Sequence, residues 1–369
     1  MATQTRIWRH FDVWLLAAVA VLTIAGIAMI QSAVADNPEL IELNVVGRQA
    51  AYAVIGLVIL LLTAAIDYRM WSALSRAMYI FILVFLAIIP ISGVVGFGSA
   101  RWFRLATVTI QPSELAKIIM ILVLADYFAR NETRITQART LVRSLLLTGV
   151  PLLLVFSQPD LSTSITIGVI WLALLWSAGG NMKHLLALGG VGALASIAIW
   201  PFMQTYQKAR VVTFLFPDPG ASFGATYNVR QALISIGSGG WFGQGYGQGT
   251  QVQLRFLKVR HTDFIFSAIS QEFGFVGAMA LILLMMFVIY RCLRAARIAR
   301  DTFGALVCYG VAILLLFQGS FNIAMNMNLM PVSGLPLPFV SYGGSSLLSG
   351  LLGIGLVESV ILRHKKIEL

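Results

Sequence analysis

The sequence predicts an all-α polytopic membrane protein with about ten transmembrane helices and one large extracytoplasmic loop between the seventh and eighth spans. Of the 369 residues, 58% are hydrophobic and only 11% are charged, which excludes an ordinary soluble domain. Apolar runs recur along the chain at about the 20 residues that a membrane-spanning helix needs. Basic residues are concentrated in every second connection between these runs, as is typical of multi-pass proteins.

Ten apolar runs are the expected spans. They lie at residues 11–31, 50–66, 78–97, 112–129, 141–157, 162–178, 184–202, 264–290, 303–326 and 340–362. The fourth and fifth are the least regular, because the fourth contains Glu114, Lys117 and Asp126 and the fifth contains Arg143 and Pro151. Charged groups inside a span are costly unless they are paired or face a wet cavity, so the fourth span is expected to line the interior of the protein.

The distribution of Lys and Arg predicts the orientation of the chain. With the N-terminus inside, 16 of the 26 basic residues fall in inside connections and only 3 fall in the short outside ones. Because cytoplasmic loops are enriched in Lys and Arg, we expect one integral membrane domain, residues 1–369, with both termini in the cytoplasm. The net charge of +11 then reflects topology and not nucleic-acid binding, since the cations are scattered over short loops.

The connection at residues 203–262 is the large loop, and it is expected outside. Loops of this length are usually functional or disordered, and its many aromatic residues argue against disorder. Residues 225–236 fit a short amphipathic helix on the membrane surface. Glycine then occupies every second position from 243 to 249. This pattern admits two interpretations, amides that face a phosphate or a tight re-entrant turn, and the turn is favoured.

Asp263 lies where the large loop meets the eighth span. A carboxylate at a membrane boundary is costly and is a functional hypothesis by default, although an acid there also fits a helix cap. Asp263 is a candidate general base, because it lies at the water interface beside a cation-rich loop. The helix N-terminus lowers its basicity, whereas burial raises it. His261 is placed to orient or tune it, although a lone surface histidine usually does neither.

Glu114 and Lys117 are three residues apart, so they share one face of the fourth span. They are either a self-satisfied ion pair or the lining of an outward-open cavity in which Lys117 meets a phosphate. Asp160, which precedes the sixth span, is expected to cap a helix.

Three arginines lie on the same predicted side of the membrane as Asp263. Arg101 and Arg104 precede the fourth span, and Arg210 is near the start of the large loop. Each alone fits a side chain that snorkels at the membrane interface. Together they are a candidate site for a polyanion.

Five motifs occur in order along the chain. They are Gln111–Lys117 (QPSELAK), Gln158–Leu161 (QPDL), the glycine-rich stretch 237–251, His261–Phe266 (HTDFIF) and Pro331–Ser346 (PVSGLPLPFVSYGGSS). Together they resemble the shape, elongation, division and sporulation (SEDS) family from the first span to the last. The proline-rich run before the tenth span resembles the RodA branch more than the FtsW branch. Lys258 departs from the family pattern, where proline is expected, and so does Arg230-Gln231-Ala232, where Gln followed by Ser is more frequent.

This resemblance implies a ten-span peptidoglycan glycosyltransferase that polymerises lipid II on the outer face of the cytoplasmic membrane, for cell elongation and shape. The essential aspartate of the family falls on Asp263, and its cavity carboxylate and lysine fall on Glu114 and Lys117. We expect Asp263 to be the catalytic base and no protein metal site. The expected substrate-binding residues are Glu114, Lys117, Arg101, Arg104, Asp160, Arg210, Gln231, His261 and Ser341.

A polyprenyl pyrophosphate leaves readily as an anion, so one base and several cations suffice for an inverting displacement. No cofactor is firmly implied, and a divalent cation such as Mg²⁺ or Mn²⁺ is an open option. The expected partners are lipid II, undecaprenyl-linked glycan, a class B penicillin-binding protein that acts as transpeptidase, and other membrane proteins of the elongation complex. The alternatives are a lipid II flippase, an FtsW-like division polymerase, and a scaffold that only anchors the transpeptidase.

Overall fold

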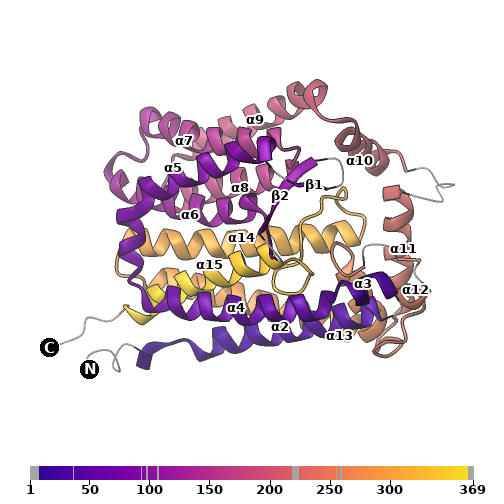
Figure 1. Ribbon diagram of the computed structural model, residues 1–369. Helices are drawn as coiled ribbons and strands as arrows, with labels where there is room; N and C mark the ends of the chain where they lie inside the picture. The colour runs from indigo at the N-terminus through magenta and orange to yellow at the C-terminus, as the bar shows by residue number, and fades with distance from the viewer. Residues whose placement is uncertain are drawn as a thin grey trace.

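The computed structural model describes residues 8–35, 37–92, 94–96, 99–105, 108–217, 224–254, 256–257 and 260–364. Long helices run roughly side by side through the molecule (Figure 1). They are α2 (Val13–Val34), α4 (Val45–Ala65), α5 (Tyr68–Ser92), α6 (Pro112–Arg130), α7 (Ala138–Ser157), α8 (Leu161–Ser177), α9 (Met182–Ile199), α13 (Ile265–Ile298), α14 (Thr302–Asn326) and α15 (Gly344–Leu362).

Shorter elements connect these helices. They are η1 (Trp8–His10), α3 (Pro38–Glu42), η2 (Glu132–Arg134), η3 (Trp200–Phe202), α10 (Thr205–Leu215), α11 (Gly224–Ser238), α12 (Thr250–Gln253) and the strands β1 (Val94–Gly96), β2 (Ser99–Leu105) and β3 (Val108–Ile110). The helices α10, α11 and α12 of the large loop lie at the end of the molecule opposite both termini (Figure 1). The short helix expected at 225–236 is present as α11.

The helical multi-pass class is confirmed, because a helix lies at each of the ten expected runs. Within the described residues, seven helices are long and apolar enough to cross a membrane. The helix α6 is not among them and carries four charged side chains, and α8 has 17 residues. The count of ten spans therefore stays a prediction.

The all-α expectation is wrong in one place, between α5 and α6. The third run was expected to continue to residue 97, but α5 ends at Ser92 and β1, β2 and β3 form an antiparallel sheet in that order. Val94 pairs with Trp102, and Leu105 pairs with Val108. Valine, aromatic residues and threonine favour strands, and local pairing satisfies the backbone of this connection without a longer helix.

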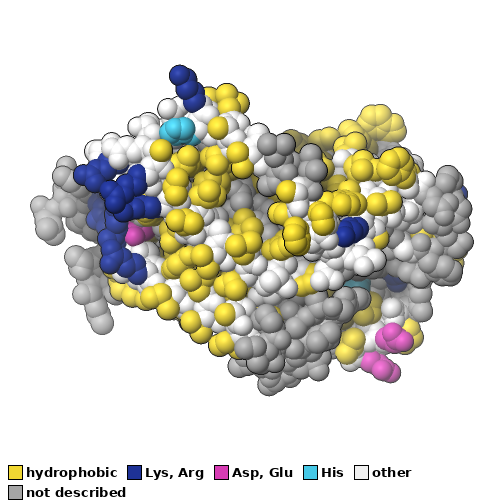
Figure 2. Space-filling model, turned by 90° about the horizontal axis from the view of Figure 1, so that it is seen from above, with side chains coloured by type: hydrophobic (Ala, Val, Ile, Leu, Met, Phe, Trp, Pro, Cys, Tyr) yellow, Lys and Arg dark blue, Asp and Glu magenta, His cyan; other side chains and the backbone are white. Residues whose placement is uncertain are grey.

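The centre of the bundle is formed by α14 and α15. At least about two thirds of the residues in the most apolar stretch of each helix are buried, whereas less than a third are buried in α4 and α5. Figure 1 shows α14 and α15 between a layer with α2, α4 and α13 and a layer with α5 to α9. Figure 2 shows apolar side chains along the middle of the molecule and most of the visible Lys and Arg side chains at the end that carries the termini.

The helix α13 is broken at Gly274, which has φ 67° and ψ −164°. The break frees main-chain groups, and the glycine-rich loop satisfies them. The amides of Gln244 and Gly245 donate to the carbonyl oxygens of Gln271 and Glu272 at 2.9 and 3.0 Å, and two bonds run in the other direction. The loop is therefore a turn folded onto α13. The amides of Gln244 and Gly245 already donate hydrogen bonds to α13, so these two amides do not bind a phosphate.

Gly243→Ala is expected to lower the melting temperature of the purified protein. Gly243 has φ +81°, and an added Cβ would lie 2.1 Å from the carbonyl oxygen of Glu272. A side chain in this left-handed conformation costs about 2 kcal/mol before the clash is counted. Gly237→Ala is the control, because that helical position has no atom within 4 Å of an added Cβ. Equal melting temperatures for the two variants would contradict the packing of the loop against α13.

Candidate active site

Asp263 directly precedes α13 and is half-buried. Burial raises the pKa of its carboxyl group to about 6, and the guanidinium of Arg210 opposes the rise. Arg210 on α10 is therefore close enough to act on the carboxylate by its charge. A carboxyl group with a pKa near neutrality is well suited to accept a proton from a hydroxyl at physiological pH.

His261 lies two residues before Asp263. Burial and the charge of Arg260 lower the pKa of its imidazole to about 4, so the ring is neutral at physiological pH. It lies 5.8 Å from the Tyr342 ring, centroid to centroid. The neutral ring does not act on Asp263 as a cation, and its contact with substrate stays a prediction.

Ser341 lies in the segment that joins α14 and α15, which packs against the residues before α13. Its hydroxyl donates to the carbonyl oxygen of Thr262 at 2.8 Å and accepts from the amide of Leu337 at 2.9 Å. The side chain is buried. Ser341 thus holds the Asp263 segment in place, and its predicted contact with substrate stays a prediction.

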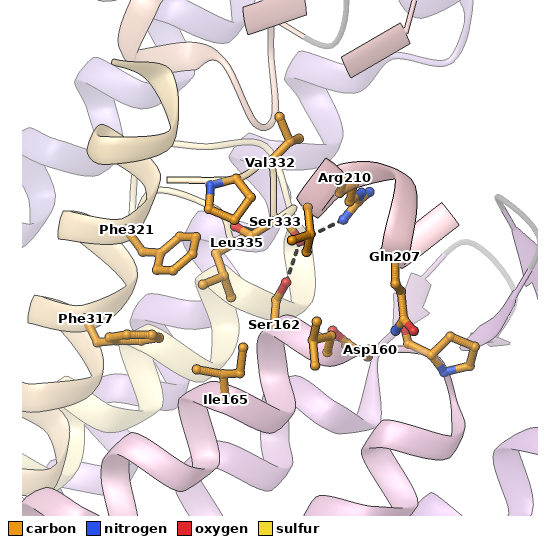
Figure 3. A pocket seen from close by; sticks show the side chains of 14 residues that line it. Asp160, Ser162, Ile165, Gln207, Arg210, Phe317, Phe321, Val332, Ser333 and Leu335 are labelled. Atoms are coloured by element: carbon orange, nitrogen blue, oxygen red, sulfur yellow. Dashed lines mark hydrogen bonds between the residues drawn. The ribbon is translucent and has the colours of Figure 1, made fainter. Parts of the chain in front are cut away.

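A pocket lies between α8, α10, α14 and the segment after α14 (Figure 3). Arg210 donates through Nη1 to the carbonyl oxygen of Ser333 at 3.3 Å, and the hydroxyl of Ser162 donates to the same oxygen at 2.6 Å. Phe317 and Phe321 line another wall. The pocket therefore combines a cation with apolar surface.

A second pocket shares Arg210 with the first. Its lining is mostly apolar and includes Phe214, Val229, Leu233 and Met330. Arg210 therefore stands where two pockets meet, within electrostatic reach of Asp263. Such a place suits a ligand that joins an anionic group to a long apolar chain.

Asp160 borders the first pocket but its carboxylate is engaged. It accepts from the amide of Thr163 at 3.2 Å, from the Thr163 hydroxyl at 2.9 Å and from the side-chain amide of Gln111 at 3.2 Å. It caps α8, as the sequence predicts. A substrate would have to compete with these bonds, and that role stays a prediction.

Glu114 and Lys117 form a buried ion pair on α6. Lys117 Nζ lies 2.7 Å from Glu114 Oε1, and Lys117 has no exposed surface. Ser349 of α15 donates to Glu114 Oε2 at 3.4 Å. The geometry matches the self-satisfied pair, one of the two alternatives that the spacing allows. Within the described part of the chain, no hydrogen bond or ion pair joins this pair to Asp263.

The remaining predicted residues are spread over other elements. Gln231 is half-buried on α11, and Arg101 and Arg104 lie on β2. Their contacts with substrate stay predictions, and Lys258 lies outside the described residues.

Sequence reasoning missed Asn322 and Asn326, whose side-chain amides donate to the carbonyl oxygen of Asp263. Two asparagines four residues apart in a largely apolar span were the available signal.

Fold and site together define a polytopic helical membrane protein with a perturbed carboxylate beside an arginine, where a long loop meets a helix. The chain belongs to the family described as "Cell cycle protein", which covers FtsW, RodA and SpoVE and matches residues 12–366. The SEDS resemblance of the five motifs is thereby confirmed.

Several relatives are similar over nearly their whole length. The peptidoglycan glycosyltransferase MrdB of Escherichia coli (strain K12) is 36% identical over 360 residues, which covers 97% of this chain and 95% of MrdB. A relative from Geobacter sp. (strain M18) that carries the FtsW name is 32% identical over 363 residues, covering 96% of this chain and 98% of its own length.

Two solved structures share the fold. A chain from a peptidoglycan synthase complex, studied for its coordination of polymerization and crosslinking, gives a TM-score of 0.81 at 29% identity, with 96% of this chain and 98% of that chain covered. The rod shape determining protein RodA of Thermus thermophilus gives a TM-score of 0.72 at 29% identity, with the same coverage.

Proposed function

We propose that this chain is a peptidoglycan glycosyltransferase that polymerises lipid II into glycan strands on the outer face of the cytoplasmic membrane. An FtsW relative and the MrdB relative are both named as peptidoglycan glycosyltransferases, the FtsW relative as a probable one. The observation that carries the proposal is Asp263, a carboxylate whose pKa burial raises to about 6 beside the Arg210 guanidinium. This pairing supports Asp263 as the base and Arg210 as a cation that holds the pyrophosphate.

In the proposed reaction Asp263 accepts the proton of the acceptor sugar hydroxyl. The hydroxyl oxygen forms a bond to the anomeric carbon of the donor, and the bond from that carbon to the pyrophosphate oxygen breaks. The polyprenyl pyrophosphate leaves with the electron pair, and direct displacement inverts the configuration. Glycosidases need a second carboxyl group to protonate a poor leaving group, but a pyrophosphate stabilised by cations does not need one.

Arg210 is the cation that we assign to the pyrophosphate, because it joins the two pockets and acts on Asp263. Arg101 and Arg104 are further proposed cations, and so is Lys117, which would have to exchange its buried contact with Glu114 for the pyrophosphate. Within the described ranges, no three His, Cys, Asp or Glu side chains are grouped so that they could hold a metal ion. We therefore derive no step through a divalent cation.

We propose the elongation role over the division role. The support is the RodA-like proline-rich run before α15, together with the MrdB and RodA relatives. We also propose that both termini are cytoplasmic, since most of the Lys and Arg side chains visible in Figure 2 lie at the end of the molecule that carries the termini in Figure 1. The same orientation places α10, α11 and Asp263 outside.

A class B penicillin-binding protein is the proposed partner. The similar solved chain comes from a complex that coordinates polymerization and crosslinking. We propose that the partner orders the large loop and raises the polymerase rate by fixing Asp263 against the acceptor.

Purified protein with its transpeptidase partner is expected to polymerise labelled lipid II in detergent micelles with Mg²⁺ or Mn²⁺ present. A detergent micelle has no separate leaflets, so transfer of lipid II from one leaflet to the other cannot produce a signal in this assay. Glycan strands are resolved by length on a gel. If folded complex yields no strands while a lipid II transport assay in vesicles is positive, the flippase alternative replaces this proposal.

A further inference from the structure

The last two turns of α14 carry two asparagines, Asn322 and Asn326, in a largely apolar helix. They are four residues apart and share one helix face. Neither side chain has any exposed surface. A buried amide is costly unless its hydrogen bonds are made, so the partners of these two amides show what the residues are for.

Both amides converge on the main chain of Asp263. Asn322 Nδ2 and Asn326 Nδ2 donate to its carbonyl oxygen at 3.1 and 3.0 Å. Asn322 Nδ2 also donates to the carbonyl oxygen of Leu335 at 2.8 Å. Two donors on one carbonyl oxygen use both of its lone pairs, which fixes the position of the peptide unit that follows Asp263.

Asn326 also caps α13 from a neighbouring helix. Its Oδ1 accepts from the amide of Ser267 at 3.2 Å and from the Ser267 hydroxyl at 2.6 Å. Phe264, at the N-cap position of α13, provides no side-chain cap. The first turn of a helix has amides without intrahelical partners, so α14 supplies the cap that α13 lacks.

The two preceding carbonyl oxygens are held as well. The amide of Tyr342 donates to His261 at 2.9 Å, and the hydroxyl of Ser341 donates to Thr262 at 2.8 Å. Three successive main-chain carbonyls thus have fixed donors. Among the described residues, no side chain donates a hydrogen bond to the Asp263 carboxylate itself. The main chain is immobilised while the carboxylate keeps its acceptor sites for a substrate proton.

The geometry points to Asn322 and Asn326 as positioning residues that fix the Asp263 main chain, so that the carboxylate meets the acceptor hydroxyl in one orientation. This inference rests on the proposed role of Asp263 as general base. Because α14 is buried at the centre of the bundle, it is a rigid support for such a group. Positioning errors of about 1 Å can lower a rate about a hundredfold.

A purely structural cap makes a different prediction. If the asparagines only stabilise the fold, variants lose melting temperature, and each folded molecule keeps its turnover number and pH profile. If they position Asp263, the turnover number of folded protein falls while KM changes little. A loosened carboxylate also becomes more hydrated, so the acid limb of the pH profile moves to lower pH. Among the described residues, Arg210 on α10 acts on Asp263 by its charge, and Arg260 and Tyr342 lie beside the neighbouring His261.

The test uses Asn322→Leu, Asn326→Leu and the double variant in the purified complex, because leucine keeps the volume and adds no charge. We expect kcat of the double variant, per folded molecule, to fall on the order of a hundredfold, with the acid limb shifted to lower pH. Asn131→Leu is the control, since its amide donates to Tyr127 at 2.8 Å away from this site. A double variant with native kcat and native pH profile would overturn the inference.

Two further variants keep the result interpretable. If the leucine variants do not fold, Ser267→Ala removes one partner of Asn326 Oδ1 and leaves both amide donors in place. It is expected to lower kcat several-fold, and native kcat would count against the inference. Asp263→Asn is measured in the same series. Turnover by that variant refutes the base itself, whereas inactive Asp263→Asn beside fully active asparagine variants refutes only the positioning.

Discussion

Polymerisation of lipid II is expected to stop when Asp263 is replaced by asparagine. The substitution keeps the size of the side chain and removes the proton acceptor. General-base catalysis contributes about a hundredfold to ten-thousandfold to a rate, so the product should fall to the limit of detection. The measurement is strand formation by purified Asp263→Asn complex beside native complex.

The same variant should fold at least as well as the native chain. Burial raises the pKa of Asp263 from 3.8 to about 6, so the folded state binds its proton more tightly than the unfolded state. Stability from this group is therefore lost as the pH rises through about 6, and at neutral pH the ionised carboxylate destabilises the fold. A neutral asparagine removes that cost. Near-native turnover by well-folded Asp263→Asn would refute the base assignment.

Lys117→Met is expected to reduce activity more than it reduces stability. The ammonium is buried 2.7 Å from Glu114, and breaking a buried ion pair costs on the order of 3 kcal/mol when the partner stays charged. Protonation of Glu114 makes the real cost smaller. Loss of a pyrophosphate-binding cation, in contrast, acts directly on the transition state. Strand formation and melting temperature are measured on the same preparation.

The double variant Glu114→Gln/Lys117→Met separates the two roles of this pair. It removes both charges, so it should recover most of the lost stability. If Lys117 meets the pyrophosphate, activity stays low in the double variant. Recovery of activity together with stability would show that the pair is structural.

Hydrophobic patterning was sufficient to predict the helices, because membrane-spanning helices must be long and apolar. It failed between Ser92 and Pro112, where the apolar signal runs past the end of α5 into β1 and a short sheet. Nor did it predict the break at Gly274, which depends on hydrogen bonds from the glycine-rich loop. Such long-range pairing leaves no periodic pattern in the sequence.

The candidate site also has features that the sequence predicted and features that it did not. Asp263 was predictable, because a carboxylate where a polar loop meets an apolar run is a functional hypothesis and because it falls on the essential aspartate of the resembled family. The capping role of Asp160 and the pairing of Glu114 with Lys117 follow from local spacing. The contact of Asn322 with Asp263 was not predictable, since 59 residues separate them.

The most direct test of the account is the pH dependence of strand formation by the purified complex in micelles. Burial gives Asp263 a pKa of about 6, and the base must be ionised to accept a proton. His261, whose pKa is lowered to about 4, does not titrate in this range. The account predicts that kcat/KM, which reports the pKa of the free enzyme, rises about tenfold per pH unit below about pH 6 and is level above it. A rate that stays constant from about pH 5 to about pH 7 would contradict Asp263 as the general base.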